Sequence, residues 1–284
     1  MNSPGKLYIV STPIGNLEDI SSRTARILGE VDFIAAEDTR VTAKILNHLG
    51  LKKSLISCQK YNEKERSSQI VSRILTGENA AFCSDAGTPV ISDPGGTLVS
   101  KALDEGVTVI PIPGPSAVVT ALSVCGLRCE RFCFEGFLPS QDDKKARKRI
   151  LEDLKDESRT IIVYEAPHHL RAALDDLYEN LGDRRISICR ELTKKFEDVN
   201  PTTIERAISF YKYNEPRGEY VLVIEGKSLE EQDEEKRKSW QDMSVEDHMK
   251  FYEDQGIPRK EAMKMVAADR GVGKREIYKE LLGE

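Results

Sequence analysis

The 284-residue sequence lacks several features that mark membrane proteins and common nucleotide-binding proteins. No apolar run approaches the roughly 20 residues that span a bilayer, and the apolar run near the N-terminus is too short for a signal peptide. Neither a GxGxxG motif nor a GxxxxGK[ST] motif is present, which makes a dinucleotide or ATP site a poor interpretation. We therefore expect a cytoplasmic protein with no membrane partner.

Histidine and cysteine, the usual ligands of transition metals, are few and unfavourably spaced. The four histidines form no HExxH motif, and Cys125, Cys129 and Cys133 have a four-residue spacing that does not match paired zinc ligands. Several cysteines lie instead in apolar runs, where a free thiol behaves as a small hydrophobe. We expect buried thiols and no metal.

Short apolar runs alternate with helical patterns along the first part of the chain. The strand-like runs are 7–11, 32–37, 54–58, 80–83 and 107–112. Strands that alternate with helices indicate an α/β domain with a largely parallel sheet. Beyond residue 116 the strands are separated more irregularly, which predicts a second α/β domain with a mixed sheet, including a helix that starts at Pro201.

Changes in composition place the expected domain boundaries. We predict an N-terminal α/β domain at 1–113, a C-terminal α/β domain at 114–226, a charged linker at 227–239 and a helical module at 240–284. The linker has many charges and no apolar periodicity. The last two helices of the module are separated by a short glycine-containing turn, which is typical of helix-turn-helix-like modules.

Four turn-rich segments follow strands in the two α/β domains. They are STPIGN (11–16), SDAGTPVISDPGG (84–96), PIPGPS (111–116) and YEAPHH (164–169). In open α/β sheets, ligands bind outside the carboxyl ends of the strands. Glycine lets a backbone approach a ligand closely, and proline makes a loop rigid. The pattern alone therefore predicts a small-molecule cleft at one end of an α/β domain.

Seven ordered motifs between residues 7 and 226 resemble those of a known family. They are LYIVSTPIGNLEDI, AAEDTR, SDAGTPVISDPG, PIPGPSA, YEAPHH, CRELTKKFE and RGEYVLVIEG. The chain resembles the ribosomal RNA small subunit methyltransferase I family of the tetrapyrrole methylase superfamily, whose C-terminal module its helical appendage also resembles. The resemblance implies a two-domain α/β fold that holds S-adenosylmethionine (SAM) in the cleft between the domains. It also implies a homodimer that methylates the ribose 2′-oxygen of a cytidine in the decoding region of 16S RNA, in the small ribosomal subunit.

The expected SAM-binding residues lie in these loops and motifs. Asp85 would face the ammonium group at the methionine end, because charge-assisted hydrogen bonds are the strong ones; an Asx turn is the alternative. Ser116 and Ala117 begin a helix whose N–H groups suit a carboxylate, or Ser116 is a plain N-cap. Asp93 could contact the cofactor or cap the helix after Pro94. The full set is Pro13, Gly15, Asp85, Ala86, Gly87, Ser116, Ala117, Ala166, Pro167, Glu191, Gly218 and Tyr220.

The expected catalytic residues follow from the chemistry of the acceptor. A ribose hydroxyl is a weak nucleophile. Methyl transfer to it therefore needs alignment of the hydroxyl with the methyl group, and a side chain that removes or orients the hydroxyl proton. Glu37, Asp38 and Arg40 follow a buried strand, and Lys194 lies in CRELTKKFE. We expect Glu37 or Asp38 as the base, with Arg40 or Lys194 on the hydroxyl or a phosphate. An Arg–carboxylate pair that only braces the loop is the alternative, and the histidine pair of YEAPHH is a weaker base candidate.

Two basic stretches are the expected RNA contacts, although the net charge of the chain is −6. Residues 142–149 and 258–279 are rich in lysine and arginine and could contact phosphates. A solvated helix face is the alternative for the first stretch. The candidates are Lys144, Lys145, Arg147, Lys148, Arg149, Arg259, Lys260, Lys274 and Arg275. Two rival functions stay open: a SAM-dependent methylase of a tetrapyrrole or another small molecule, and a non-catalytic regulator that binds SAM or nucleic acid.

Overall fold

A computed structural model describes residues 3–228, 240 and 243–282. One compact unit comprises Met1–Leu154 and Thr160–Glu225, and a second comprises Lys155–Arg159 and Gly226–Glu284. The predicted linker at 227–239 lies outside the described residues, apart from its first two. The predicted boundary between residues 113 and 114 falls inside the first unit and stays a prediction.

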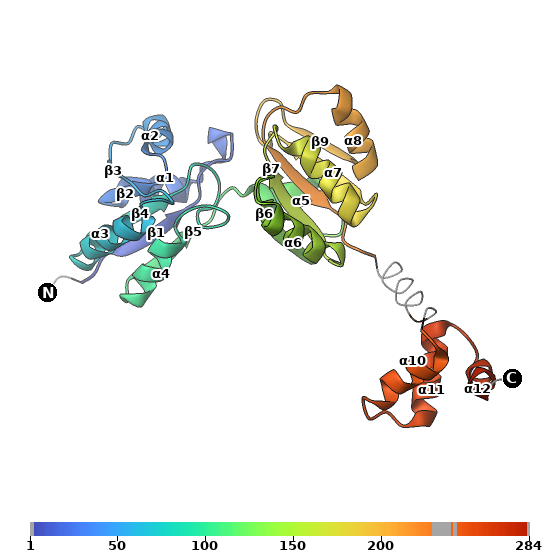
Figure 1. Ribbon diagram of the computed structural model, residues 1–284. Coiled ribbons are helices and arrows are strands. Elements are labelled where there is room, and N and C mark those ends of the chain that lie inside the picture. Colours follow the sequence, from blue (N-terminus) through green and yellow to red (C-terminus); the bar gives the residue numbers. More distant parts are fainter. Residues whose placement is uncertain (1–2, 229–239, 241–242, 283–284) are drawn as a thin grey trace. The chain divides into compact units, whose positions relative to one another are not determined.

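The first sheet contains five strands in the order β3-β2-β4-β1-β5, and all its pairs are parallel (Figure 1). The strands are β1 (Lys6–Val10), β2 (Phe33–Ala36), β3 (Ser54–Ser57), β4 (Ala80–Cys83) and β5 (Thr108–Ile112). The connections contain the 3-10 helix η1 (Leu17–Asp19) and the helices α1 (Ser22–Glu30), α2 (Thr39–His48), α3 (Glu63–Leu75) and α4 (Gly96–Asp104). The predicted parallel sheet is confirmed.

Helices cover both faces of the first sheet, as the alternation of its buried side chains requires. On one face, Phe33 and Phe82 pack with apolar residues of α3 and α4. On the other, Ile34 and Cys83 pack with apolar residues of α1 and α2. Successive residues of a strand point to opposite faces, so a strand buried on both faces reads as a continuous apolar run. This is why β2 and β4 are recognisable in the sequence.

The second sheet has the order β6-β7-β10-β8-β9 and is mixed. Strands β6 and β7 are parallel, and the other neighbours are antiparallel. The strands are β6 (Phe132–Phe137), β7 (Thr160–Glu165), β8 (Arg185–Arg190), β9 (Asp198–Thr203) and β10 (Tyr220–Ile224). The helices are α5 (Ala117–Val124), α6 (Lys144–Lys155), α7 (Leu170–Leu181) and α8 (Ile204–Tyr213). The predicted mixed sheet is confirmed.

The predicted helix start at Pro201 is wrong. Residues Asp198–Thr203 form strand β9, in which Pro201 pairs with Ser187, and α8 begins at Ile204. Proline cannot donate a ladder hydrogen bond, but it is tolerated in an edge strand, and β9 is the edge of this sheet. The side chain of Thr203 accepts a hydrogen bond from the Arg206 N–H and forms the actual N-cap.

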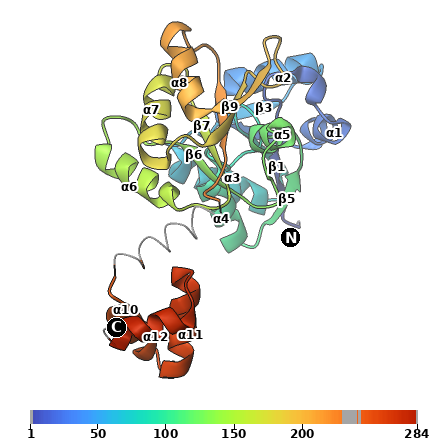
Figure 2. The same cartoon turned by 90° about the vertical axis from the view of Figure 1, so that its right-hand side faces the viewer.

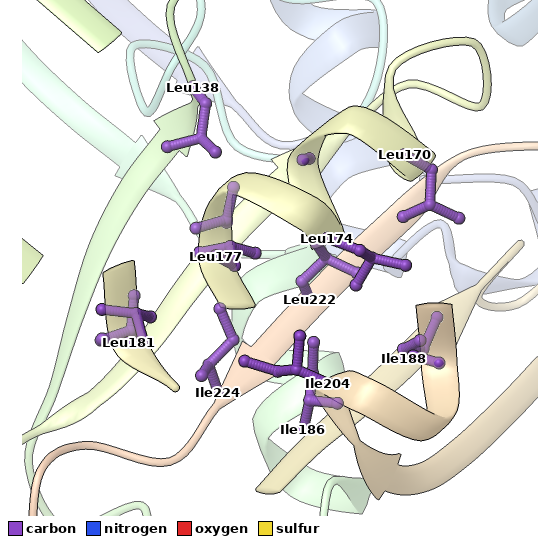
Figure 3. Close-up of a cluster of buried hydrophobic side chains, with 14 of the residues drawn as sticks. Leu138, Leu170, Leu174, Leu177, Leu181, Ile186, Ile188, Ile204, Leu222 and Ile224 are labelled. Atoms are coloured by element: carbon purple, nitrogen blue, oxygen red, sulfur yellow. The ribbon is translucent and has the colours of Figure 1, made fainter. Parts of the chain in front are cut away.

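The largest apolar cluster lies between the second sheet and helices α6, α7 and α8 (Figure 3). Leu174 and Leu177 of α7 project toward Leu222 and Ile224 of β10 in this view, and all four side chains are fully buried. The opposite face of the sheet packs against α5 through a second cluster, which includes Val118. The sheet is therefore covered on both faces.

The helical module contains α10 (Val245–Glu253), α11 (Arg259–Arg270) and α12 (Lys274–Leu282), which pack around their own small apolar core (Figure 2). Ser244 caps α10, as predicted, by accepting a hydrogen bond from the Asp247 N–H at 3.0 Å. Gly271 ends α11 with a left-handed φ of 67°, a conformation that glycine adopts at low cost. A buried His248 links the helices, because its Nε2 lies 3.2 Å from Asp269.

Candidate active site

The loops after β1 and β4 are joined directly. The backbone N–H of Thr12 donates to the Gly87 carbonyl at 2.9 Å, and the Gly87 N–H donates back at 3.0 Å. The Thr12 hydroxyl also donates to the Ser84 carbonyl. Gly87 has a left-handed φ of 77°, which favours glycine at this point of the turn. Segments 11–16 and 84–96, predicted to share a site, therefore lie side by side.

The loop after β5 meets the same place. Thr88 donates from its hydroxyl to the Pro115 carbonyl at 3.2 Å and lies 3.1 Å from the Ser11 hydroxyl. A Cβ on Gly114 would lie 2.9 Å from the Ser11 Cβ, so the two backbones are as close as glycine permits. Three of the four predicted loops thus converge at the carboxyl ends of β1, β4 and β5.

The N-terminal end of α5 directly follows the loop after β5 and belongs to the same group of segments. Ser116 occupies the N-cap position, but its side chain makes no capping hydrogen bond. The Val118 N–H, in the first turn, hydrogen-bonds the hydroxyl of Tyr164 at the end of β7. Sequence reasoning missed Tyr164, which only the packing of the second sheet on α5 brings to this helix. Ser116 is therefore the N-cap residue, as one alternative had it, but without a side-chain capping bond, and the predicted carboxylate site at Ser116 and Ala117 stays a prediction.

Carboxylates from two loops gather at the ends of β2 and β4. The Asp85 carboxylate accepts a hydrogen bond from the Asp38 N–H at 2.9 Å, and Glu37 accepts one from the Asp85 N–H at 3.3 Å. Asp93 interacts with Ser84 and adds its charge to the group. It does not cap α4 as one alternative proposed, because the N-cap residue is Gly95 and has no side-chain cap.

The pKa values of Glu37, Asp93 and Asp38 are shifted in different directions. Burial raises the pKa of Glu37 above its ordinary 4.5; the Asp85 N–H opposes the shift, and the charges of Asp85, Asp93 and Asp38 add to it. Burial also raises the pKa of Asp93. Asp38 behaves in the opposite way, because hydrogen bonds from Arg40 lower its pKa to about 2. A base needs a pKa near the working pH, so Glu37 is better suited than Asp38.

The Arg40 guanidinium holds the Asp38 carboxylate in a two-pronged contact, with Nη2 2.5 Å from Oδ2. Asp38 also caps α2 by accepting a hydrogen bond from the Arg40 N–H at 2.8 Å. This is the bracing pair that the sequence left open as an alternative. The arginine side chain is 85% exposed, so the remaining guanidinium face can meet a ligand.

Lys194 lies between two carboxylates, at 2.9 Å from Glu191 and 2.7 Å from Glu219. Burial opposes its charge, but the hydrogen bonds to these partners prevail and raise the pKa of Lys194. It therefore acts as a cation and not as a base. A Cβ on Gly15 would lie 2.4 Å from the Lys194 Cγ, and one on Gly218 would lie 2.5 Å from the Glu191 Cγ. The glycines are thus needed beside these side chains.

Of the remaining predicted cofactor residues, Tyr220 offers only its backbone. Its ring is buried in the apolar cluster of the second sheet, 6.0 Å from the ring of Tyr211. Its hydroxyl accepts a hydrogen bond from the Arg217 N–H. Ala166 and Pro167 are half-buried in the turn that leads into α7, and Pro13 is buried.

The basic residues of α6 divide into two kinds. Four of the five candidates are exposed: Lys144, Lys145, Lys148 and Arg149. Arg147 is only 5% exposed, and it donates to Asp176 at 2.6 Å and to the Pro139 carbonyl at 2.7 Å. We therefore correct the expectation for Arg147, which braces α6 against α7. It also lines a hollow of about 390 Å³ between these helices, together with Lys144 and Lys148.

In the helical module, Arg259, Lys260 and Arg275 are exposed and Lys274 is half-buried. Arg270 differs, because its guanidinium contacts His248 and the Met243 carbonyl inside the module. The residues that the structure describes contain no cluster of three or more histidine, cysteine or acidic side chains able to hold a metal ion. Across the same described ranges, no helix is long and apolar enough to cross a membrane.

Comparison with known proteins agrees with this architecture. The chain resembles solved structures of diphthine synthase (TM-score 0.60, 16% identity, 79% of this chain and 91% of that one) and of uroporphyrin-III-C-methyltransferase from Thermus thermophilus (0.56, 18%, 77% and 94%). At these identities the likeness concerns the fold alone. A sequence profile described as Tetrapyrrole (Corrin/Porphyrin) Methylases matches residues 6–208, which gives the class of protein.

Closer relatives narrow this class. Proteins named ribosomal RNA small subunit methyltransferase I are 46% identical in Halalkalibacterium halodurans (96% of this chain, 93% of the relative) and 44% identical in Bacillus subtilis (96% and 93%). A third, from Escherichia coli O157:H7, is 43% identical over 82% of each chain. The chain belongs to the ribosomal RNA small subunit methyltransferase I family, which confirms the resemblance carried by the seven motifs.

Arg40→Gln should raise the pKa of Asp38 from about 2 toward its ordinary value of 3.8. The reason is that the arginine hydrogen bonds and charge favour the ionised carboxylate. Carbon-13 NMR of the Asp38 carboxyl should show an ionised group from pH 5 to 3 in the parent protein and a midpoint within that window in the variant. Arg26→Gln, which removes a cation paired with Glu30 in α1, is the control and should leave the titration unchanged. An unchanged midpoint in Arg40→Gln would show that Arg40 is not the cause.

Proposed function

We propose that this protein transfers the methyl group of SAM to the ribose 2′-oxygen of a cytidine in 16S ribosomal RNA of the small subunit. The observation that carries the proposal is the convergence of three strand-end loops beside a half-buried Glu37 whose pKa is raised. The names of the close relatives support ribosomal RNA as the substrate. The resemblance of the seven motifs supports the cytidine and the 2′-oxygen, and a homodimer as the working assembly.

The residues present suit SAM. The sulfonium and the α-ammonium are cationic, and the neighbouring Asp85 and Asp93 supply negative charge in loop 84–96. The SAM carboxylate would lie at the first turn of α5, where Ser116 leaves the helix start without a side-chain cap. A Cβ on Gly87 would lie 3.3 Å from the Ile14 Cγ2, so glycine leaves room where these loops approach each other. SAM supplies an electrophilic methyl group; the chain supplies position and charge.

The protein's part in the chemistry is to align the ribose hydroxyl and to take its proton. Glu37 would accept the proton at its carboxylate, because its raised pKa lies closer to neutrality than that of Asp38. Arg40 is exposed beside it and would hold a phosphate or the acceptor oxygen. Lys194 stays protonated between Glu191 and Glu219, so it would contribute positive charge near the ribose.

RNA attraction would come from the exposed lysines and arginines of α6 and of the helical module. Phosphate contacts fix position and depend on salt, but they carry little sequence information. In α12, Arg275 and Lys279 are both exposed on the same helix. Their four-residue spacing places them on one face. We propose this face as a phosphate-binding surface.

The function is tested with purified protein, SAM carrying a labelled methyl group, and small ribosomal subunits from cells that lack this modification. We expect label in the 16S RNA, within an alkali-resistant dinucleotide, because a 2′-O-methyl group blocks hydrolysis of the adjacent phosphodiester. Naked 16S RNA and a tetrapyrrole are the comparison substrates. Label that is lost to alkaline hydrolysis would exclude ribose methylation, label in the tetrapyrrole alone would favour a small-molecule methylase, and no label at all would favour a regulator.

Glu37→Gln should lower the rate of methyl transfer by roughly 10²-fold or more while SAM affinity is kept, the usual scale for loss of a general base. In the parent protein the rate should fall with acidification as Glu37 becomes protonated, and the variant should lack this limb of the pH–rate profile. Asp38→Asn is the matched control, because Asp38 is already ionised above about pH 2. A larger loss in Asp38→Asn than in Glu37→Gln would assign the base to Asp38.

The double variant Arg275→Gln/Lys279→Gln should weaken RNA binding and leave SAM binding intact. The slope of log affinity against log salt should become shallower by about two units, one for each phosphate that the variant no longer neutralises. The control Lys52→Gln/Lys101→Gln removes the same amount of charge elsewhere. Lys52 precedes β3, and Lys101 lies in α4, which leads into β5, so both segments approach the amino ends of the first-sheet strands. An unchanged slope in the α12 variant, or an equal change in the control, would reject this surface as a phosphate site.

A further inference from the structure

Glu63, the first residue of α3, sends its carboxylate to another helix. The side chain is almost completely buried, and Oε1 accepts hydrogen bonds from the backbone N–H groups of Gly95 (3.0 Å), Thr97 (2.8 Å) and Leu98 (3.3 Å). These groups form the N-terminus of α4, whose N-cap residue Gly95 has no side chain to satisfy them. A carboxylate is favoured there by the unpaired N–H groups and the helix dipole.

This contact fixes the end of the loop 84–96. Gly95 has a φ of 118°, and a Cβ at this position would lie 2.4 Å from the ring of Phe82. The chain therefore turns back tightly over the strand that precedes the loop, where only glycine fits. The start of the same loop is fixed at Gly87 by its two hydrogen bonds with Thr12. Two anchors from outside the loop therefore hold it: Thr12 at Gly87 and Glu63 at Gly95.

The part between these two anchors is strained. Val90 has a φ of 77° and Ser92 one of 65°. A left-handed conformation is uncommon for serine and a true outlier for a β-branched residue such as valine. Within the segment, the Val90 N–H donates to the Pro94 carbonyl at 3.2 Å. Such conformations persist only where the surroundings hold them, so releasing one anchor would let the segment relax.

We propose that Glu63 is a positioning residue for SAM binding: it holds loop 84–96 in the strained shape that presents Asp93 to the cofactor. It acts through the backbone of α4 and does not itself reach the ligand. The inference rests on the proposed SAM site. Glu63 lies at the charged start of a helix, and neither a loop nor a sequence motif marks it as functional.

The test measures SAM affinity and loop protection in Glu63→Ala and Glu63→Gln. Calorimetric titration should give a SAM Kd at least tenfold weaker for Glu63→Ala, with a smaller loss for Glu63→Gln, whose amide oxygen can still accept hydrogen bonds. In turnover, the KM for SAM should rise while kcat at saturating SAM stays within a few-fold. Amide hydrogen exchange should become faster in peptides that cover 84–98 and stay unchanged in peptides of the second sheet.

Glu78→Gln is the matched control, because Glu78 follows the opposite end of α3 and pairs there with Arg73 at 2.6 Å. It should leave SAM affinity unchanged. A SAM Kd within twofold of the parent value in folded Glu63→Ala, despite faster exchange of the loop, would overturn the proposal. So would faster exchange throughout the protein, which would reveal a general loss of stability. If the parent protein and Glu78→Gln both fail to bind SAM, the proposed function itself fails and the inference falls with it.

Discussion

Parallel pairing of β4 with both β1 and β2 is the constraint on which the candidate site depends. The register sets Ile9 beside Phe82 and Ala36 beside Cys83, so the three strands end at nearly the same level. Because parallel strands deliver their carboxyl ends to one edge, the strand register itself brings the loops at 11, 37 and 84 to the same place. A shift of register by one residue would reverse every side chain of β4 between the two faces.

The same convergence creates an electrostatic cost. Glu37, Asp38, Asp85 and Asp93 come from loops that share this edge, and only Asp38 has a close arginine among the described contacts. Like charges in a partly buried group disfavour further ionisation, and they add to the burial that raises the pKa of Glu37 and that of Asp93. A cationic ligand relieves this repulsion when it binds. The arrangement therefore suits a sulfonium better than an anionic nucleotide.

The sequence indicates the strands well, since β2, β4 and β10 are buried on both faces and read as apolar runs. It also indicates the loops through their glycine and proline content. It does not predict contacts between distant residues, such as the Asp38 N–H on Asp85, which lie 47 residues apart. Nor does it separate Arg147 from its basic neighbours on α6, because only the packing of α6 on α7 buries one face of that helix. Pro201 misled the prediction because a proline suits a helix start and an edge strand equally well.

The distribution of charge explains why one chain needs both an acidic site and basic helices. A group of carboxylates at the strand ends attracts a cationic cofactor, but it repels the phosphates of an RNA. On the proposed function, attraction of RNA would therefore come from other surfaces, such as the exposed cations of α6 and α12. Arg40 and Lys194 stand at the site as the local exceptions, each held by carboxylates of the protein itself. Their charges are partly neutralised, so on the proposed function they would orient a ribose and its phosphate without competing with the acids for a cationic cofactor.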